Sequence, residues 1–315
     1  MAKNIFLFSG QGSQYVGMAK DLYDNFDGAK KIFETANIVL GYDLKSIVFD
    51  GPAEELNKTI NSQPAIMACS LCAFEAMKAN NVTFDGVAGH SLGEYAAMVA
   101  CGMISLEDGF KLIKVRAEAM QKAAEENNGS MYAIIGLPAD EIEKLCEETD
   151  GYVVPVNYNS TVQTVVAGNN EACEKLAEKV VKMKKRAIKL NVASAFHSKM
   201  MLSATEPLKN AAKEIEFNTP AVEIYSNVLG EKLEDFTNIP ELLAKHIVSP
   251  VKFTSELAQM DKAGYENYIE LGPNKVLTGL VKKTLKGKNA VNVEDMKSLE
   301  KALTSIDNWQ LTMHN

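Results

Sequence analysis

The sequence predicts an α/β fold in which a hydrolase-like, mainly parallel sheet is covered by helices and a small ferredoxin-like (βαββαβ) subdomain is inserted. Apolar runs of strand length alternate with helical patterns in both end regions, which is typical of a parallel sheet covered on both faces. In the middle of the chain the order changes to β-α-β-β-α-β, the split ferredoxin-like arrangement. We therefore expect a large subdomain of residues 1–127 and 197–315 and a small subdomain of residues 128–196.

The composition is that of a folded globular protein. With 315 residues, of which 46% are hydrophobic, the chain can bury one large core or two smaller ones. A formal net charge of -8 argues against a protein that coats nucleic acid or an anionic membrane. The first residues lack the pattern of a signal peptide, and no apolar run reaches the roughly 20 residues of a membrane-spanning helix. We expect a cytoplasmic protein without a nucleic-acid or membrane partner.

Cysteine usage predicts neither disulfides nor a metal centre. Five cysteines, an odd number in a long chain, do not form a disulfide framework. Cys69 and Cys72 form a Cys-x-x-Cys motif, which can belong to a redox or zinc site. They lie in an apolar helical stretch, and no second pair has metal-site spacing. We interpret both as small buried side chains and expect no metal.

The elements of the large subdomain follow from its apolar patterns. Strands are expected at 5–8, 82–88, 224–228 and 265–271. Helices are expected at 19–40, 52–56, 63–79, 94–101 and 240–247, and in two further stretches that end near residues 215 and 285. Ser105 is expected to cap a long helix that ends near residue 127, with Asp108 in a capping-box-like arrangement.

The small subdomain is predicted from a second set of patterns. Strands are expected at 131–136, 152–158, 162–167 and 186–190, and helices at 138–148 and 169–182. The tripeptide Asn159-Ser160-Thr161 is expected to join the two middle strands, and Asn169 to cap the second helix. An inserted unit of this kind commonly forms one wall of a cleft.

Ser91 is the predicted nucleophile. Residues 89–93 read Gly-His-Ser-Leu-Gly, a Gly-x-Ser-x-Gly pattern between a predicted strand and a predicted alanine-rich helix. In this context the pattern is typical of a nucleophile elbow, a tight turn that lifts the serine hydroxyl clear of the sheet. The turn also places Ser91 at a helix N-terminus, where free N–H groups and the helix dipole can stabilise an oxyanion.

The loop at residues 9–14 follows the first strand and contains Gly10 and Gly12. A dinucleotide fingerprint would need a third glycine at position 15, where Tyr15 stands. The loop is therefore either a plain glycine turn or a loop that presents N–H donors to a site. Residues alone leave both interpretations open.

Two histidines are candidates for a general base. His197 lies where the chain leaves the small subdomain, which is a natural place for a cleft residue, and His246 lies in a helical run that favours a structural role. His90 belongs to the elbow, with its side chain expected to point away from that of Ser91, and His314 lies near the end of the chain. Position therefore favours His197.

Arg116 lies in the middle of the predicted helix that Ser105 caps. Its apolar neighbours Ile113, Ala117 and Met120 allow it to point inward. An arginine can equally extend along an apolar surface with its charge in water. Periodicity alone favours the surface position.

Several motifs occur together in one order. They are Phe8-Ser9-Gly10-Gln11-Gly12-Ser13-Gln14, Gly89-His90-Ser91-Leu92-Gly93-Glu94, Arg116 with Met120-Gln121, Asn157-Tyr158-Asn159-Ser160, Ala195-Phe196-His197-Ser198, Ser249-Pro250-Val251 and Gly272-Pro273-Asn274-Lys275-Val276-Leu277. With these motifs the chain resembles the malonyl-CoA:acyl carrier protein transacylases of bacterial fatty-acid synthesis. The resemblance runs from the first strand to about residue 285.

The resemblance implies a ping-pong acyl transfer. Ser91 would attack the thioester of malonyl-CoA, and His197 would accept the serine proton. The backbone N–H groups of Gln11 and Leu92 would hold the oxyanion. Arg116 would bind the free malonyl carboxylate with its forked guanidinium, and the phosphopantetheine thiol of acyl carrier protein would then take the acyl group.

The resemblance also assigns supporting roles. A main-chain carbonyl in the segment from His246 to Ser249 would orient the catalytic imidazole in place of an aspartate. Met120 and Asn159 would contribute to substrate binding, and Phe196 would narrow the acyl pocket in favour of malonyl over branched units. No cofactor or metal is implied, and we expect a monomer. Two basic stretches, 182–189 and 282–288, are candidate docking sites for the acidic carrier protein.

Two other functions share parts of this pattern. A serine hydrolase, either an esterase or a thioesterase, has the same elbow but has no use for a buried cation at Arg116. A non-catalytic subunit that binds carrier protein would have a vestigial site and would form no acyl adduct on Ser91.

Overall fold

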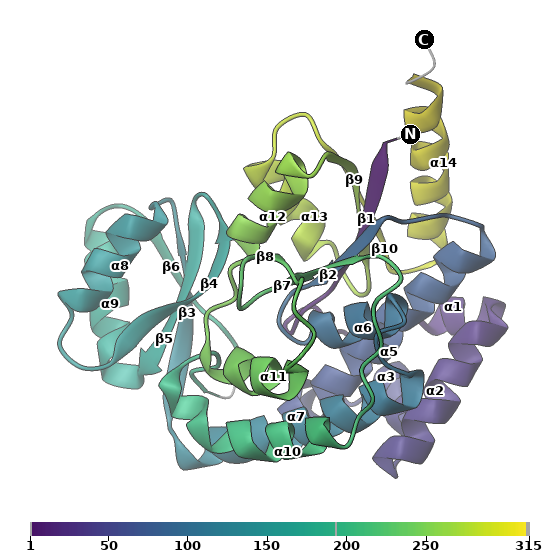
Figure 1. The fold of residues 1–315 in the computed structure, drawn as a ribbon. Helices are drawn as coiled ribbons and strands as arrows, with labels where there is room; N and C mark the ends of the chain where they lie inside the picture. The colour runs from purple at the N-terminus through teal and green to yellow at the C-terminus, as the bar shows by residue number, and fades with distance from the viewer. Residues whose placement is uncertain (1, 193, 313–315) are drawn as a thin grey trace.

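A computed structural model describes residues 2–192 and 194–312, which form two sheets with surrounding helices (Figure 1). The strands are β1 (Lys3–Phe8), β2 (Gly86–Gly89), β3 (Gly129–Ile135), β4 (Val153–Ser160), β5 (Gln163–Asn169), β6 (Arg186–Lys189), β7 (Glu223–Ser226), β8 (Glu231–Lys232), β9 (Tyr265–Leu271) and β10 (Asn289–Val293). The helices are α1 (Lys20–Asn25), α2 (Asp27–Leu40), α3 (Leu44–Asp50), α4 (Ala53–Asn57), α5 (Thr59–Ala79), α6 (Gly93–Ala100), α7 (Leu106–Glu126), α8 (Ala139–Glu147), α9 (Asn170–Lys182), the 3-10 helix η1 (Lys199–Ala204), α10 (Thr205–Lys213), α11 (Ile239–Val248), α12 (Phe253–Lys262), α13 (Val276–Thr284) and α14 (Met296–Thr312).

The larger sheet has the strand order β10-β9-β1-β2-β7-β8 and is parallel except for β8, which runs antiparallel to β7. Its central strand β1 is buried on both faces because its side chains alternate between two cores. Phe6 and Phe8 join the core beneath α5, α6 and α7, whereas Ile5 and Leu7 join the core beneath α12 and α13. The predicted parallel sheet covered by helices is confirmed.

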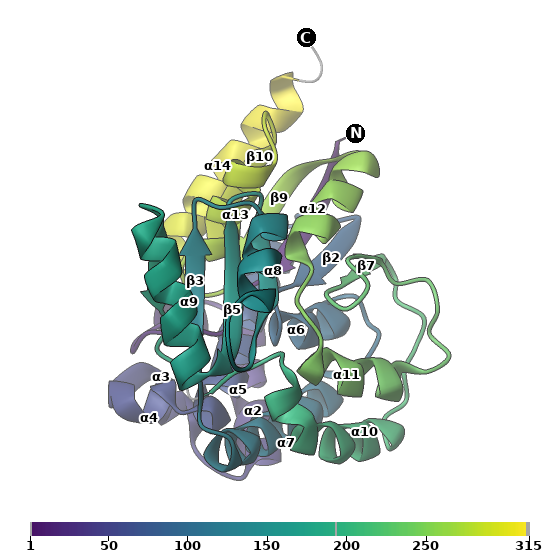
Figure 2. The same cartoon turned by 90° about the vertical axis from the view of Figure 1, so that its left-hand side faces the viewer.

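The smaller sheet has the order β4-β5-β3-β6 and is antiparallel throughout. This is the strand order of the predicted ferredoxin-like arrangement. Helices α8 and α9 cover its outer face, as Figure 2 shows. Met131, Ala133 and Val165 on the inner face join the main core beside the larger sheet. The two sheets therefore share one hydrophobic interior, and the residue limits of the two subdomains remain a prediction.

The structure corrects several predicted elements. The helix expected at 19–40 is divided into α1 and α2, because Phe26 has an extended backbone. The strand expected at 82–88 is limited to β2. Asn159 lies within β4 and not in the turn that follows it. The short strand β8, the edge strand β10 and helix α14 were not predicted.

Other local predictions are confirmed. Ser105 accepts a hydrogen bond from the backbone N–H of Asp108 and caps α7, and Asn169 likewise caps α9. Within the part of the chain that is described, no helix is long and apolar enough to cross a membrane.

Candidate active site

Ser91 lies in the turn between the end of β2 and the start of α6. Its φ of 54° is in the left-handed region, which costs a non-glycine residue about 1–2 kcal/mol. Both flanking glycines are required by close packing. A Cβ on Gly89 would lie 2.0 Å from the carbonyl carbon of Gly93, and a Cβ on Gly93 would lie 2.2 Å from the oxygen of Phe8. The elbow expected from the sequence is present.

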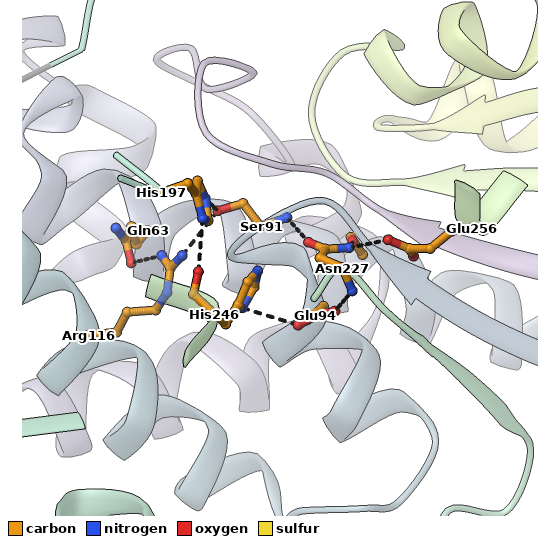
Figure 3. Close-up of polar contacts among 9 residues, drawn as sticks. Gln63, Ser91, Glu94, Arg116, His197, Asn227, His246 and Glu256 are labelled. Carbon is orange, nitrogen blue, oxygen red and sulfur yellow. Dashed lines mark hydrogen bonds and ion pairs between the residues drawn. The ribbon is translucent and has the colours of Figure 1, made fainter. Parts of the chain in front are cut away.

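The structure brings the imidazole of His197 to the hydroxyl of Ser91, with 2.7 Å between Nε2 and Oγ (Figure 3). On the other side of the ring, Nδ1 donates a hydrogen bond of 3.0 Å to the carbonyl oxygen of His246. Because a carbonyl can only accept, Nδ1 carries the hydrogen and the lone pair of Nε2 faces Ser91. The backbone of Ser249 also interacts with this ring and, like the carbonyl of His246, raises the pKa of His197, but by less.

His197 is held in its neutral form. Burial, and after it the nearby charge of Arg116, lowers its pKa to about 3. The side chain of His197 is 4% exposed. A neutral imidazole with its lone pair on the serine hydroxyl is ready to accept a proton.

Arg116 points inward from α7 and is 1% exposed, so the surface position that periodicity favoured is wrong. Its Nη2 donates to Ser91 Oγ over 3.0 Å, and its Nη1 donates to Gln63 Oε1 over 2.6 Å. Among the described residues, no carboxylate forms an ion pair with Arg116, and its Nε has no hydrogen-bond acceptor. A buried guanidinium without a counter-ion is a strong site for an anion.

A cavity of about 60 Å³ opens beside Ser91 and His197. It is lined by Gln11, His90, Ser91, Met120, Met131, Asn157, Leu190, Val192, Phe196 and His197. Residues of both sheets and their connections form its walls, so the cavity lies between the two parts of the molecule. The sequence indicated Gln11, Met120 and Phe196 as site residues, and it missed Met131, Asn157, Leu190 and Val192.

The loop at residues 9–14 reaches this cavity through Gln11. Ser13 Oγ donates to the carbonyl of Gly10, and Asn274 Nδ2 donates to the carbonyl of Ser13, so the loop is held from two sides. Across the described chain, no acceptor takes a hydrogen bond from the backbone N–H of Gln11 or of Leu92. Gln11 lines the same cavity as Ser91, and Leu92 follows Ser91 directly in the chain.

Asn159 is placed differently from the other predicted substrate-binding residues. Its Oδ1 lies 2.8 Å from Nε2 of His90, and it is absent from the cavity wall. His90 itself reaches that wall, although its side chain was expected to point away from that of Ser91. Asn159 thus contacts the cavity through His90, which must carry its hydrogen on Nε2.

The sequence did not predict three polar residues near the site: Gln63, Asn227 and Glu256. Gln63 holds Arg116 and donates to Met120 Sδ over 3.6 Å. Asn227 contacts the backbone of Ser91, and Glu256 contacts Asn227 (Figure 3). The one available signal for Gln63 was a large polar residue at the start of an apolar helix.

Within the described part of the chain, no group of three or more His, Cys, Asp or Glu residues is placed so that it could hold a metal ion. Cys69 and Cys72 are buried free thiols that contact the carbonyls of Met18 and Ala29. Their interpretation as small buried side chains is confirmed.

Comparison with known proteins gives one consistent picture. The family model described as acyl transferase domain matches residues 5–312. The malonyl CoA-acyl carrier protein transacylase of Bacillus subtilis (strain 168) is 37% identical over 311 residues, which cover 97% of this chain and 98% of that protein. The protein of the same name from Escherichia coli (strain K12) is 38% identical over 307 residues, which cover 96% of this chain and 99% of the relative.

Solved structures agree with these relatives. The malonyl CoA-acyl carrier protein transacylase of Clostridium perfringens is 39% identical, with a TM-score of 0.94 and full coverage of both chains. A malonyl-transacylase solved in complex with a type II PKS acyl-carrier protein is 36% identical, with a TM-score of 0.92. The match covers 96% of this chain and 100% of that chain.

Proposed function

Since the chain belongs to the acyl transferase domain family, we propose that it transfers the malonyl group from malonyl-CoA to the phosphopantetheine thiol of acyl carrier protein. The product would supply extender units for fatty-acid biosynthesis. The observation that carries the proposal is the double contact of Ser91 Oγ with a neutral imidazole and with an unpaired, buried guanidinium. The first contact supports acyl transfer, and the second supports a substrate with a free carboxylate.

Acylation begins when Ser91 Oγ attacks the thioester carbonyl while His197 Nε2 accepts the hydroxyl proton. The negative charge of the tetrahedral intermediate falls on the former carbonyl oxygen. The free N–H groups of Gln11 and Leu92 supply two donors for it, helped by the N-terminus of α6. When the carbon–sulfur bond breaks, the proton on His197 passes to the coenzyme A sulfur, and malonyl-Ser91 remains.

Arg116 gives the reaction its substrate class. A guanidinium binds a carboxylate through two parallel hydrogen bonds, and burial strengthens this contact because water does not screen it. Gln63 fixes one end of the guanidinium, while Nε and Nη2 stay on the side of Ser91. A hydrolase of neutral acyl groups would gain nothing from this buried cation.

Transfer to the second substrate reverses the first half. The phosphopantetheine thiol enters after coenzyme A has left, gives its proton to His197 and attacks the ester carbonyl of malonyl-Ser91. The bond between Ser91 Oγ and the carbonyl carbon then breaks, the proton on His197 returns to Oγ, and the malonyl thioester of the carrier leaves. The kinetics are therefore ping-pong. The buried walls of the cavity, including Met131 and Phe196, exclude water and so favour transfer over hydrolysis.

The solved complex of a related malonyl-transacylase with an acyl-carrier protein supports the choice of acceptor. The chemistry proposed here uses side chains and backbone groups of this chain alone, so it needs no cofactor. The cytoplasmic location, the monomeric state and the absence of a cofactor expected from the sequence remain predictions.

Mass spectrometry of the intact protein tests the function. Brief exposure to malonyl-CoA should add one malonyl group to Ser91, and the Ser91→Ala variant should stay unmodified. Addition of holo acyl carrier protein should then move the group to the carrier. An adduct that is lost to water at the same rate with and without carrier would indicate a hydrolase. A complete lack of adduct would indicate a non-catalytic binding protein.

A further inference from the structure

The side-chain amide of Asn227 lies directly beneath the elbow and connects it to the protein interior. Its Oδ1 accepts a hydrogen bond of 2.7 Å from the backbone N–H of Ser91. Its Nδ2 donates to the carbonyl of Gly89 and to Oε1 of Glu256, both over 2.7 Å. Asn227 thus contacts the residue with the left-handed backbone and the strand end that precedes it.

These contacts fix the orientation of the amide. If the oxygen and nitrogen of the Asn227 side chain were exchanged, two donors would face each other at Ser91 and two oxygens would face each other at Gly89. The backbone of Asn227 is also engaged, because its N–H donates to Glu94 and its carbonyl accepts from Lys252. With every polar group bonded and no exposed surface, Asn227 has a single available position.

Two buried carboxyl groups complete this support. Glu256 is fully buried and its Oε2 has no partner among the described residues, and burial raises its pKa well above the usual value, which favours the neutral carboxyl group. Burial also raises the pKa of Glu94, to about 8. The Oε2 atom of Glu94 lies 3.2 Å from Nδ1 of His246, whose carbonyl orients His197. Asn227 is therefore bonded to the turn that carries the nucleophile and, through Glu94, lies next to the residue whose carbonyl orients the base.

We propose that Asn227 is a positioning residue that holds the strained backbone of Ser91, so that Oγ points at His197 Nε2 and the N–H of Leu92 stays free. The inference rests on the proposed function only in taking Ser91 as the nucleophile. The backbone N–H of Ser91 has no partner other than Asn227 within the described chain. Without this contact the turn can relax toward an ordinary conformation, which moves the hydroxyl away from the imidazole.

The experiment measures how fast a fluorophosphonate probe labels Ser91, together with kcat and KM for malonyl transfer. Asn227→Ala should slow labelling and lower kcat by about 10–100-fold, because a displaced nucleophile reacts slowly with any electrophile. The KM for malonyl-CoA should change less than about threefold, because Arg116 and the cavity walls keep their own contacts. An unchanged labelling rate in Asn227→Ala would overturn the inference.

Two matched variants separate positioning from general loss of stability. Asn267 is a buried asparagine of β9 that bonds to Asn4 and Asn289, away from Ser91, and Ser226 is the buried neighbour of Asn227 whose hydroxyl has no partner among the described residues. Asn267→Ala and Ser226→Ala should label at the wild-type rate well below their melting temperatures. If Asn267→Ala slows labelling as much as Asn227→Ala, the effect is general and the inference fails.

Glu256 provides a second test if Asn227→Ala does not fold. Glu256→Gln keeps an acceptor for Asn227 Nδ2, whereas Glu256→Leu removes it. Leucine should slow labelling more than glutamine does, and equal rates would overturn the inference. A wild-type chain that labels on Ser91 but transfers no malonyl would refute the proposed function alone. A wild-type chain that does not label at all would refute both.

Discussion

The two sheets differ sharply in the ionisable groups that they bury. Among the described residues, the buried acidic, arginine and histidine side chains are Glu94, Arg116, His197, His246, Glu256 and Glu270. All six lie in 1–127 or 197–315, the predicted large subdomain. The strands β3 to β6 and their connections bury none, yet β3 and β4 supply Met131 and Asn157 to the cavity wall, and the segment that follows β6 supplies Leu190 and Val192. Reactive groups therefore come from one part of the molecule and much of the cavity shape comes from the other.

Sheet architecture explains this division. The parallel sheet is covered on both faces by helices, and four of these six side chains lie on such helices, α6, α7, α11 and α12, where packing removes them from water and shifts their pKa values. The antiparallel sheet uses its inner face for apolar packing and ends in β6, an exposed edge with Arg186 and Lys189. Charged residues on such an edge also discourage pairing with other chains. Changes in the two parts should thus have different consequences.

The largest effect is expected from the only buried arginine. The chain has two arginines, Arg116 in the large part and the exposed Arg186 in the small part. Arg116→Ala should lower the rate of malonyl transfer by roughly 10²–10³-fold, because a buried charge-assisted contact with the carboxylate is lost. Transfer of acetyl, which has no carboxylate, should be retained or increased. Stopped-time mass spectrometry of the acyl-enzyme with each acyl-CoA measures both rates.

Arg186→Ala is the matched control for this comparison. It removes the same side chain from the surface of the small part and should leave acylation by malonyl-CoA unchanged. An equal loss of malonyl and acetyl transfer in Arg116→Ala would contradict the carboxylate-binding role. The two variants would then differ only because Arg116 is buried and Arg186 is exposed.

The second prediction concerns acid stability, which should depend on the large part. Burial lowers the pKa of His246 well below its usual value of about 6.5. The folded protein keeps this ring neutral, whereas the unfolded chain binds a proton below pH 6.5, so the contribution of His246 to the free energy of unfolding falls as the pH falls. Between pH 7.5 and 5.5 one such histidine costs about 1.4 kcal/mol. His246→Gln should therefore lose about 1.4 kcal/mol less over this range in urea unfolding.

The remaining pH dependence in His246→Gln has other sources. His197, whose pKa is lowered to about 3, acts in the same direction as His246, whereas Glu94 and Glu270, whose pKa values burial raises to about 8 and about 7, act in the opposite direction. Equal pH dependence of the wild type and the variant would show that His246 has the same pKa in the folded protein as in the unfolded chain, which would contradict its burial as a neutral ring.

The division between the two parts also explains what the sequence could predict. Ser91 was found because a nucleophile elbow is a local pattern of glycines between a strand and a helix. His197 was found because histidines are few and its position between the subdomains is distinctive. The ferredoxin-like order was found because each of its strands and helices has a clear period. Such signals are contained within short segments.

Features that depend on distant contacts could not be predicted in this way. Asn227 and Gln63 carry no local sign of their role, because Asn227 contacts a residue 136 positions away and Gln63 contacts Arg116, 53 positions away. Periodicity alone did not predict the inward direction of Arg116, which only the family resemblance implied, because an arginine among apolar neighbours can also extend to the surface. Strand β10 was missed because Asn289–Val293 has neither a continuous apolar run nor a regular alternation, and it lies at the edge of the sheet.

The third prediction changes the shape of the cavity and leaves the chemistry intact. Phe196 is 4% exposed and lines the cavity. Phe196→Leu should make room for one methyl group and raise kcat/KM for methylmalonyl-CoA relative to malonyl-CoA by about fivefold, since one methyl is discriminated by about 1–3 kcal/mol at most. Competition between the two substrates, followed by mass spectrometry, gives the ratio. An unchanged ratio would show that Phe196 does not limit the acyl pocket.

The smallest effect is expected at the surface, where the two basic stretches can be compared directly. Lys282 and Lys283 lie on α13, which packs against β9 of the larger sheet and β4 of the smaller one. Helix α13 therefore lies where the two parts of the molecule meet, and so does the cavity. Lys184 and Lys185 follow α9 on the covered outer face of the small sheet. We therefore expect the first pair to contact an acidic carrier protein.

Exchange of Lys282 and Lys283 for glutamate should raise the KM for acyl carrier protein about threefold to fivefold, because exposed ion pairs contribute only about 0.5–1 kcal/mol. The effect should shrink at high salt, since the charges are screened. Exchange of Lys184 and Lys185 for glutamate changes the net charge by the same amount and should raise the KM for acyl carrier protein by less. Acylation by malonyl-CoA reports on the site itself and should be the same in both variants. If the second pair has the larger effect, the carrier protein docks on the small part, and that part contributes recognition as well as shape.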